Sequence, residues 1–187
     1  METNELTVLY EDNHLLVVLK PQNMPTQGDA SGDNDLLSLV KKYVKEKYDK
    51  PGEAFVGLVH RLDRPTGGVM VFAKTSKAAS RLSEQLRDGS FEKRYLAVLV
   101  GLPRDRQARL TNYLKKDEKN NMVTVVPAAI EGAKRAELVY KVVELTPKLS
   151  LVDIKLFTGR SHQIRVQMQH IGTPVFGDVR YGGTTLA

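Results

Sequence analysis

Residues 55–73 read FVGLVHRLDRPTGGVMVFA, a charged loop set between two apolar runs. The first run, residues 55–62, and the alternating run, residues 69–73, are both typical of β-strands. Gly67 and Gly68 interrupt the pattern between them and indicate a turn. The stretch therefore predicts a strand, a functional turn and a second strand, since reactive groups are commonly carried on loops that rigid elements hold.

The loop carries one carboxylate, Asp63, with Arg61 and Arg64 on either side. A nearby cation favours the ionised form of an aspartate, and an ionised, positioned carboxylate can act as a nucleophile or a base. The competing interpretation is a salt-bridged turn in which Asp63 only accepts backbone hydrogen bonds. Composition alone favours this structural interpretation, so a functional one needs support from elsewhere in the sequence.

On the N-terminal side, the pattern predicts a β-hairpin and a helix. Residues 6–19 alternate and then run apolar around a turn at residues 11–13, which indicates a hairpin with one well-buried strand that stops at residues 20–21. Leucines and valines at helical spacing in residues 36–44 predict a helix, closed by the Pro-Gly pair at residues 51–52.

On the C-terminal side, Thr75 or Ser76 can cap a helix that ends at Gly89. The β-branched, apolar run at residues 95–100 predicts a central strand. The remaining pattern predicts a hairpin, two more strands and a short helix: residues 110–114 against 122–126, residues 136–145 and 149–157, and a helix from near Ser161 to Gly172.

Strands outnumber helices in this pattern, and no repeat or linker interrupts it. We therefore predict a single α+β domain over residues 1–187, built on a large, mostly antiparallel or mixed β-sheet with a few flanking helices. The absence of cysteine excludes disulfides, a thiol nucleophile and cysteine-ligated metal sites. No signal peptide or membrane-spanning stretch is evident, so we expect a soluble cytoplasmic protein.

The formal net charge of +6 suits an anionic partner. Most of the basic side chains can be ordinary solvated surface charge. With a nucleic-acid partner, some of them would instead contact phosphates. The basic residues recur in clusters at residues 74–81, 104–109, 115–119 and 134–135.

The loop HRLDRPTGG at residues 60–68 resembles the active-site signature of the RluA/RluD-type pseudouridine synthases of ribosomal and transfer RNA. Other segments match in the same order and cover nearly the whole chain, which makes coincidence implausible. Residues 9–21 resemble the family's opening motif, residues 93–101 its tyrosine-bearing strand and residues 158–165 its third active-site segment, followed by matches at 172–174 and 177–182.

The resemblance implies a pseudouridine synthase fold with a central catalytic cleft. Asp63 would be the essential carboxylate, which either attacks the ribose or deprotonates it to give a glycal. The bond from ribose to the base nitrogen breaks, the uracil turns over while held, and a carbon–carbon bond forms at carbon 5. This isomerisation needs no redox step or external group. We therefore expect no cofactor and no metal, RNA as the partner, no membrane association, and a monomer.

The resemblance gives four further residues a role. Arg160 would pair with Asp63, since a guanidinium both orients a carboxylate and keeps it charged. Tyr95 would stack on the target base and could help the proton transfer, Ile164 would form part of the apolar wall beneath the uracil, and Arg61 would insert into the RNA where the target nucleotide leaves. Their structural alternatives are a phosphate clamp, a half-buried strand aromatic, a helix-core residue and a loop-carbonyl contact.

The histidines beside these motifs are not expected to be catalytic. A single histidine beside a strand, such as His60, is more often hydrogen-bonded than catalytic. His162 follows Ser161, but sequence neighbours seldom satisfy the geometry of a hydrolase dyad, and no elbow motif surrounds them.

The chain also departs from the family pattern. Gly67 stands where serine is common, which we expect to alter loop flexibility rather than chemistry. We expect no appended N-terminal RNA-binding domain. The match stops soon after residues 181–182, where longer members continue, so the chain is either a compact member or one that has lost a terminal segment.

Two other functions compete with this interpretation. A catalytically silent RNA-binding or RNA-folding protein could keep the scaffold, but binding alone does not require Asp63, Tyr95 and Arg160 together. A base-releasing glycoside hydrolase could also use a carboxylate, but it would need an acid–base partner, and no second carboxylate stands out.

Overall fold

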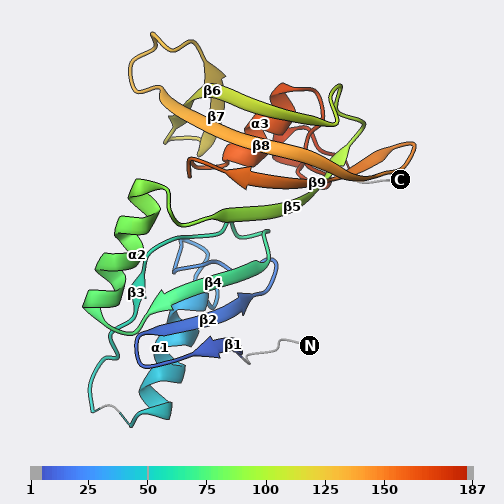
Figure 1. Cartoon of the computed structure of the whole chain (residues 1–187). Coiled ribbons are helices and arrows are strands. Elements are labelled where there is room, and N and C mark those ends of the chain that lie inside the picture. The colour runs from blue at the N-terminus through green and yellow to red at the C-terminus, as the bar shows by residue number, and fades with distance from the viewer. Residues whose placement is uncertain (1–5, 50, 185–187) are drawn as a thin grey trace. The chain divides into compact units, whose positions relative to one another are not determined.

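The computed structural model describes residues 6–49 and 51–184. The chain forms two compact units, with the boundary between Phe91 and Glu92. Each unit has its own sheet and its own core, and each is described by itself (Figure 1). None of the helices in the described residues is long and apolar enough to cross a membrane.

The first unit is built on a four-stranded antiparallel sheet in the order β1-β2-β4-β3. The register pairs Leu16 with Phe72 and Val18 with Met70, which places all four side chains on one buried face. The predicted N-terminal hairpin is confirmed, whereas the strand expected over residues 55–62 is short because most of those residues belong to the loop. The strands are β1 (Thr7–Glu11), β2 (Leu15–Lys20), β3 (Gly57–Leu58) and β4 (Gly68–Ala73).

Two helices cover opposite faces of this sheet. Helix α1 (Leu36–Lys47) packs Leu36, Val40 and Val44 against the buried face of β2 and β4. Helix α2 (Ser76–Asp88) packs on the other face, where Ala78 and Leu82 contact the cluster around Ala73.

The ends of these helices follow local sequence signals. Asp35 caps α1 by accepting a hydrogen bond from the Ser38 amide, and Thr75 caps α2 in the same way through the Ala78 amide. Gly89 ends α2 in the left-handed conformation, with φ of 83°. The predicted capping of α2 is therefore confirmed.

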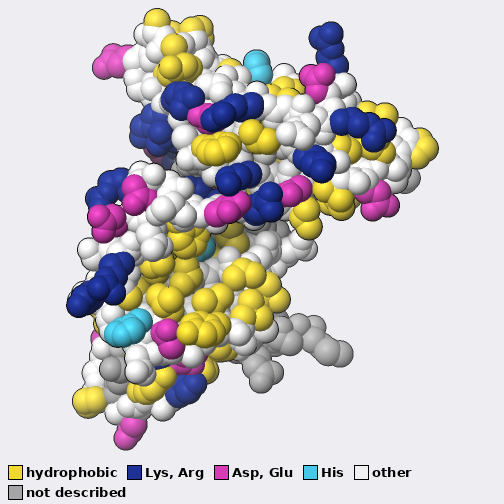
Figure 2. All heavy atoms as spheres, in the orientation of Figure 1, with side chains coloured by type: hydrophobic (Ala, Val, Ile, Leu, Met, Phe, Trp, Pro, Cys, Tyr) yellow, Lys and Arg dark blue, Asp and Glu magenta, His cyan; other side chains and the backbone are white. Residues whose placement is uncertain are grey.

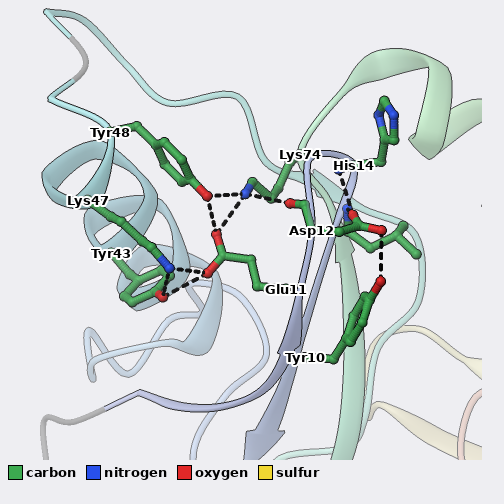
Figure 3. A network of polar contacts seen from close by, with 9 residues as sticks. Tyr10, Glu11, Asp12, His14, Tyr43, Lys47, Tyr48 and Lys74 are labelled. Carbon is green, nitrogen blue, oxygen red and sulfur yellow. Dashed lines mark hydrogen bonds and ion pairs between the residues drawn. The ribbon is translucent and has the colours of Figure 1, made fainter.

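A polar network joins β1, the end of α1 and the residue after β4 (Figure 3). The Glu11 carboxylate accepts hydrogen bonds from Tyr43, Lys47, Tyr48 and Lys74, at 2.7–2.8 Å. Burial acts to raise the pKa of Glu11, but these donors outweigh it and lower the pKa to about 2.

The second unit contains a five-stranded antiparallel sheet in the order β5-β9-β8-β6-β7. The predicted hairpin and the two long strands after it are confirmed. The run at residues 95–100 was expected to be a central strand, but β5 lies at the end of this order. Its strands are β5 (Lys93–Val100), β6 (Gln107–Asp117), β7 (Met122–Val126), β8 (Lys134–Leu145) and β9 (Leu149–Leu156).

A short segment, residues 174–176, lies along the outer side of β5. The Val100 amide donates to the Pro174 carbonyl and the Phe176 amide donates to the Val98 carbonyl, both at 2.8 Å. The C-terminal half of β5 therefore has hydrogen-bonded neighbours on both sides. An apolar strand pattern predicts burial, but it cannot say whether the neighbour is a strand or a short loop segment.

One face of this sheet is covered by α3 (Gln163–His170). Ile164, Met168 and Ile171 of the helix region pack on a cluster that includes Leu138 and Ile154, as their shared spacing predicted. A 3₁₀ turn, η1 (Val179–Tyr181), follows the helix.

The predicted α+β class, with mostly antiparallel strands and a few helices, is confirmed. The strands form two sheets rather than the one large sheet that we expected. Pairing between strands far apart in sequence is not encoded in local periodicity, so the division into sheets could not be predicted from the pattern.

Candidate functional site

The loop that carries Asp63 is clamped from two directions. The Thr26 hydroxyl donates to the Leu62 carbonyl at 2.8 Å and accepts from the Leu62 amide at 3.2 Å. The Thr66 amide donates to the Asp63 carbonyl at 3.0 Å and closes a turn. The backbone on both sides of Asp63 is thereby fixed.

Lys20 is the second clamp. It is inaccessible to solvent at the end of β2, and its Nζ donates to the carbonyls of Pro21, Met24 and Arg64 at 3.0, 2.6 and 3.1 Å. Burial lowers the pKa of Lys20 to about 8; the charge of Asp63 acts against this shift and that of Arg64 acts with it. The structure thus places a buried cation within electrostatic reach of Asp63.

The two arginines beside Asp63 are both exposed to solvent. The Arg64 guanidinium binds Asp33, donates to Ser31 Oγ at 3.1 Å and lies 3.9 Å from Asp29. It therefore fastens the loop to residues 29–33. Arg61 is exposed, as insertion into RNA would require.

His60 has a structural hydrogen bond, as expected. Its Nε2 accepts from the Val71 amide at 3.1 Å, and its ring lies 5.9 Å from that of Phe91. A ring nitrogen that accepts from an amide is unprotonated, which suits a histidine that orients the loop beside β4.

In the second unit, the segment from Thr158 to Gln163 is built around one buried amide side chain. Gln163 Oε1 accepts from the Arg160 amide at 3.0 Å and from the Thr158 hydroxyl at 2.7 Å, while its Nε2 donates to the Glu137 carbonyl at 3.1 Å. The Glu137 amide in turn donates to the Thr158 hydroxyl at 2.8 Å. This chain of hydrogen bonds fixes the backbone that carries Arg160.

Arg160 itself is exposed, and its Nε donates to the Arg135 carbonyl at 2.9 Å. One hydrogen bond to the backbone orients the guanidinium and leaves its other N–H groups able to bind an anion. The pairing of Arg160 with Asp63 stays a prediction, since the two residues belong to different units.

Tyr95 and Ile164 lie in one apolar cluster. Both are partly buried against the core that β5, β8 and β9 share with α3. The resemblance assigned them to the two sides of a uracil, and the structure brings them to the same face of the sheet. The helix-core alternative for Ile164 is also satisfied by this packing.

The start of α3 is held by a buried network. His162 has φ of 51°, a left-handed conformation that is uncommon for a residue with a side chain, and its Nδ1 lies 2.8 Å from the Tyr181 hydroxyl. That hydroxyl also accepts from the Val123 amide at 2.9 Å. The hydrogen bond between His162 and Tyr181 thus ties the start of α3 to η1.

Arg165 completes this network. It forms a two-pronged contact with Asp178, at 2.6 and 2.8 Å, and stacks 4.8 Å from the centre of the Tyr181 ring. Burial acts to raise the pKa of Asp178, but Arg165 outweighs it and the pKa is lowered.

Sequence reasoning gave no role to Lys20, Thr26, Glu137 or Gln163, the side chains that hold the two loops. For Lys20 a signal was present: it continues the buried alternation of Leu16 and Val18, where a lysine is out of place unless it is fully hydrogen-bonded. In the described part of the chain, no group of three or more His, Asp or Glu side chains could hold a metal ion.

Comparison with known proteins identifies the family to which the chain belongs. A model of the RNA pseudouridylate synthase family matches residues 14–170. Ribosomal large subunit pseudouridine synthase C of Buchnera aphidicola subsp. Acyrthosiphon pisum is 34% identical over 179 residues, which cover 96% of this chain and 55% of that protein. Ribosomal large subunit pseudouridine synthase D of Zymomonas mobilis is 36% identical over 179 residues, which cover 95% and 56%.

A solved structure, Human RNA Pseudouridylate Synthase Domain Containing 4, superposes with a TM-score of 0.80 at 26% identity. The superposition covers 94% of this chain and 68% of that one. The fold is therefore that of a pseudouridine synthase domain. Because the family model spans residues of both units, the chain belongs to the RNA pseudouridylate synthase family. It spans about half the length of the curated relatives it matches.

Proposed function

We propose that the chain isomerises uridine to pseudouridine in RNA, with Asp63 as the catalytic carboxylate. The observation that carries the proposal is the Asp63 loop: its backbone is pinned by Thr26 and Lys20, which is the preorganisation that a reacting group needs. Family membership supplies the reaction.

In the proposed reaction, Asp63 attacks the ribose or removes a proton from it, and the bond between ribose and the base nitrogen breaks. Tyr95 stacks on the detached uracil and Ile164 lines the apolar side, so that the base stays held while it turns. Arg160 orients the carboxylate, and Arg61 fills the space that the extruded nucleotide leaves. Carbon 5 of the uracil then bonds to the ribose as the bond from Asp63 breaks or as the glycal regains its proton. The proton on carbon 5 leaves to solvent or a nearby group, and the base nitrogen that was bound to ribose takes one up.

We further propose that the substrate is a structured ribosomal or transfer RNA, read by one catalytic domain acting as a cytoplasmic monomer. The names of the relatives favour ribosomal RNA of the large subunit. The net charge of +6 suits any RNA and does not choose between these substrates.

The test is incubation of the protein with unmodified total RNA, followed by nucleoside analysis and position mapping. We expect pseudouridine without release of free uracil. Free uracil would instead show a base-releasing hydrolase, and tight binding with no change in nucleosides would show a silent RNA-binding protein. Mapping identifies the modified RNA and the uridine.

The matched control is Asp63→Asn, which nearly keeps the shape of the side chain but removes the carboxylate. We expect pseudouridine to fall below detection while the thermal unfolding temperature stays within a few degrees of wild type. Activity within a few-fold of wild type would remove Asp63 from the chemistry.

A further inference from the structure

The two faces of the five-stranded sheet carry different side chains. The face opposite α3 has rows that the strand register defines: Arg109, Val139, Lys155 and Arg94 cross β6, β8, β9 and β5 in that order. Figure 2 shows Lys and Arg side chains gathered over the strands of this unit, with apolar ones among them. Among the described residues of the second unit, the α-helix is α3, which packs on the other face.

One corner of this face is a built cluster, here called the Arg–Phe corner: Arg109, Arg135, Glu137 and Phe157. The Glu137 side chain is only 5% exposed and binds both arginines, with Arg135 at 2.5 Å. The arginine side chains remain 60% and 53% exposed. The buried carboxylate thus holds two guanidiniums in place while part of each still faces solvent.

Phe157 supplies an exposed aromatic surface. The residue is 42% exposed. The Arg109 guanidinium lies 4.9 Å from the ring centre and Lys155 Nζ lies 5.8 Å from it. An exposed aromatic ring beside an arginine and a lysine is a combination on which unpaired bases stack while their phosphates are bound.

The corner is rigid and adjoins the segment that carries Arg160. The Glu137 carbonyl accepts from the amides of Phe157 and Thr158 at 3.0 and 3.3 Å. The Arg135 carbonyl accepts from Arg160 Nε. A preformed platform loses little conformational entropy on binding, and a strand of RNA that reaches Arg160 passes close to it.

We propose that the Arg–Phe corner binds an unpaired nucleotide of the RNA that flanks the target uridine. Its base stacks on Phe157, and its phosphate accepts hydrogen bonds from Arg109 and Arg135. A purely structural role for the cluster would be to neutralise the charge of Glu137. One arginine is enough for that, and no exposed ring is needed, so this role does not explain the second arginine or Phe157. The inference rests on the proposed function for the identity of the ligand as RNA.

The test uses the full chain and a labelled single-stranded RNA of mixed sequence, about 12 nucleotides long, with a blunt duplex of equal length beside it. We expect Phe157→Ala to raise the dissociation constant for the single strand about tenfold and to change duplex binding far less, because paired bases cannot stack on the ring. Phe157→Leu should lose most of the same affinity, since it keeps apolar area without a flat π-surface.

Arg94 provides a matched control for Arg109. Both arginines lie in one row of the same face, and their side chains are 62% and 60% exposed, but β8 and β9 separate them. Arg109→Gln should weaken single-strand binding and reduce the salt slope by about 0.7, the value of one phosphate contact. Arg94→Gln removes the same charge and should leave both quantities within twofold of wild type.

The proposal is wrong if Phe157→Ala and Arg109→Gln both keep wild-type affinity for the single strand, with unchanged thermal unfolding. It is also wrong if Arg94→Gln and Arg109→Gln lose equal affinity, which would show that binding depends on diffuse charge. Equal loss of single-strand and duplex binding in Phe157→Ala would refute stacking. Pseudouridine formation by the wild-type protein is measured separately, so the corner and the proposed function can fail independently.

Discussion

At the scale of single residues, Lys20 stands out because a charged side chain without solvent access must be fully hydrogen-bonded to be tolerated. A protonated amine has three N–H donors, and Lys20 has three carbonyl acceptors. One of those carbonyls, that of Arg64, belongs to the residue after Asp63. The protonation of Lys20 is therefore coupled to the position of the proposed catalytic carboxylate.

We predict that the single-turnover rate falls as the pH rises through about 8, the pKa of Lys20. Above this pH the neutral amine has only two N–H groups, so one carbonyl loses its donor and the positive charge near Asp63 disappears. Lys20→Met should react between about tenfold and a hundredfold more slowly, because a displaced carboxylate reacts poorly. It should also lack this alkaline decline.

The measurement is the rate at saturating protein across the pH range, for wild type and Lys20→Met on one RNA. Any decline that the two proteins share belongs to titration of the RNA. If both profiles coincide after scaling, Lys20 does not act through its charge.

Arg160 gives a second prediction at this scale. Its amide and its Nε are both held within the second unit, so the side chain is positioned without help from substrate. Arg160→Met should reduce turnover far more than RNA affinity, and Arg160→Lys should restore only part of it, because a point charge cannot reproduce the planar fork. Single-turnover rates and dissociation constants measured on the three proteins separate the roles. Equal losses of turnover rate and of RNA affinity would show that Arg160 acts chiefly as a phosphate contact.

At the scale of elements, the Glu11 network ties three separate pieces of the first unit together. The folded pKa of Glu11 is about 2, below its ordinary value of 4.5. The carboxylate is ionised in both states above pH 4.5, where its stabilisation is fully present. Between pH 4.5 and about 2 the unfolded chain takes up a proton that the folded chain does not, so this contribution is lost as the pH falls.

We predict that Glu11→Gln lowers the free energy of unfolding at neutral pH by about 1–3 kcal/mol, because four donors lose a charged acceptor. Its stability should also depend less on pH over the acid range, since an amide does not titrate there. Urea unfolding at a series of pH values measures both effects. If the free energies of unfolding of variant and wild type fall in parallel as the pH is lowered, Glu11 is not the cause of the loss of stability in acid.

The elements also show how far the sequence could be interpreted. Caps such as Thr75 and Gly89 act within one turn of a helix, so both ends of α2 could be predicted. The position of β5 in its sheet could not, because it depends on where β9 and residues 174–176 pair with it. At the candidate site, Asp63 and Arg160 were proposed through motifs, whereas Glu137 was not, because it is brought to Arg109 and Gln163, more than 20 residues away, only by the fold.

At the scale of the whole molecule, the excess of positive charge is the feature that bears on RNA binding. We predict a steep salt dependence, with each neutralised phosphate contributing about 0.7 to the fall in log affinity against log salt. Lys115 is exposed on β6, whereas Lys116 already pairs with Glu118 at 2.5 Å. Neutralising both lysines should therefore lower the slope by about one contact rather than two.

Affinities measured across salt concentrations for wild type and the double variant decide this prediction. An unchanged slope would show that Lys115 and Lys116 of β6 do not contact the RNA. A shallow slope in the wild-type protein would refute the electrostatic account as a whole.

The segment at residues 174–176 has a consequence for the behaviour of the protein in concentrated solution. A strand with an open edge is a template on which other chains can aggregate, and the exposed Leu96 and Val98 would make β5 an adhesive one. Residues 174–176 occupy half of that edge. Gly183 lies against this segment, and glycine is required there because an added Cβ would lie 1.8 Å from the Val175 carbonyl oxygen. Solubility therefore depends on a glycine outside the sheet, because it keeps the cover on β5 in place.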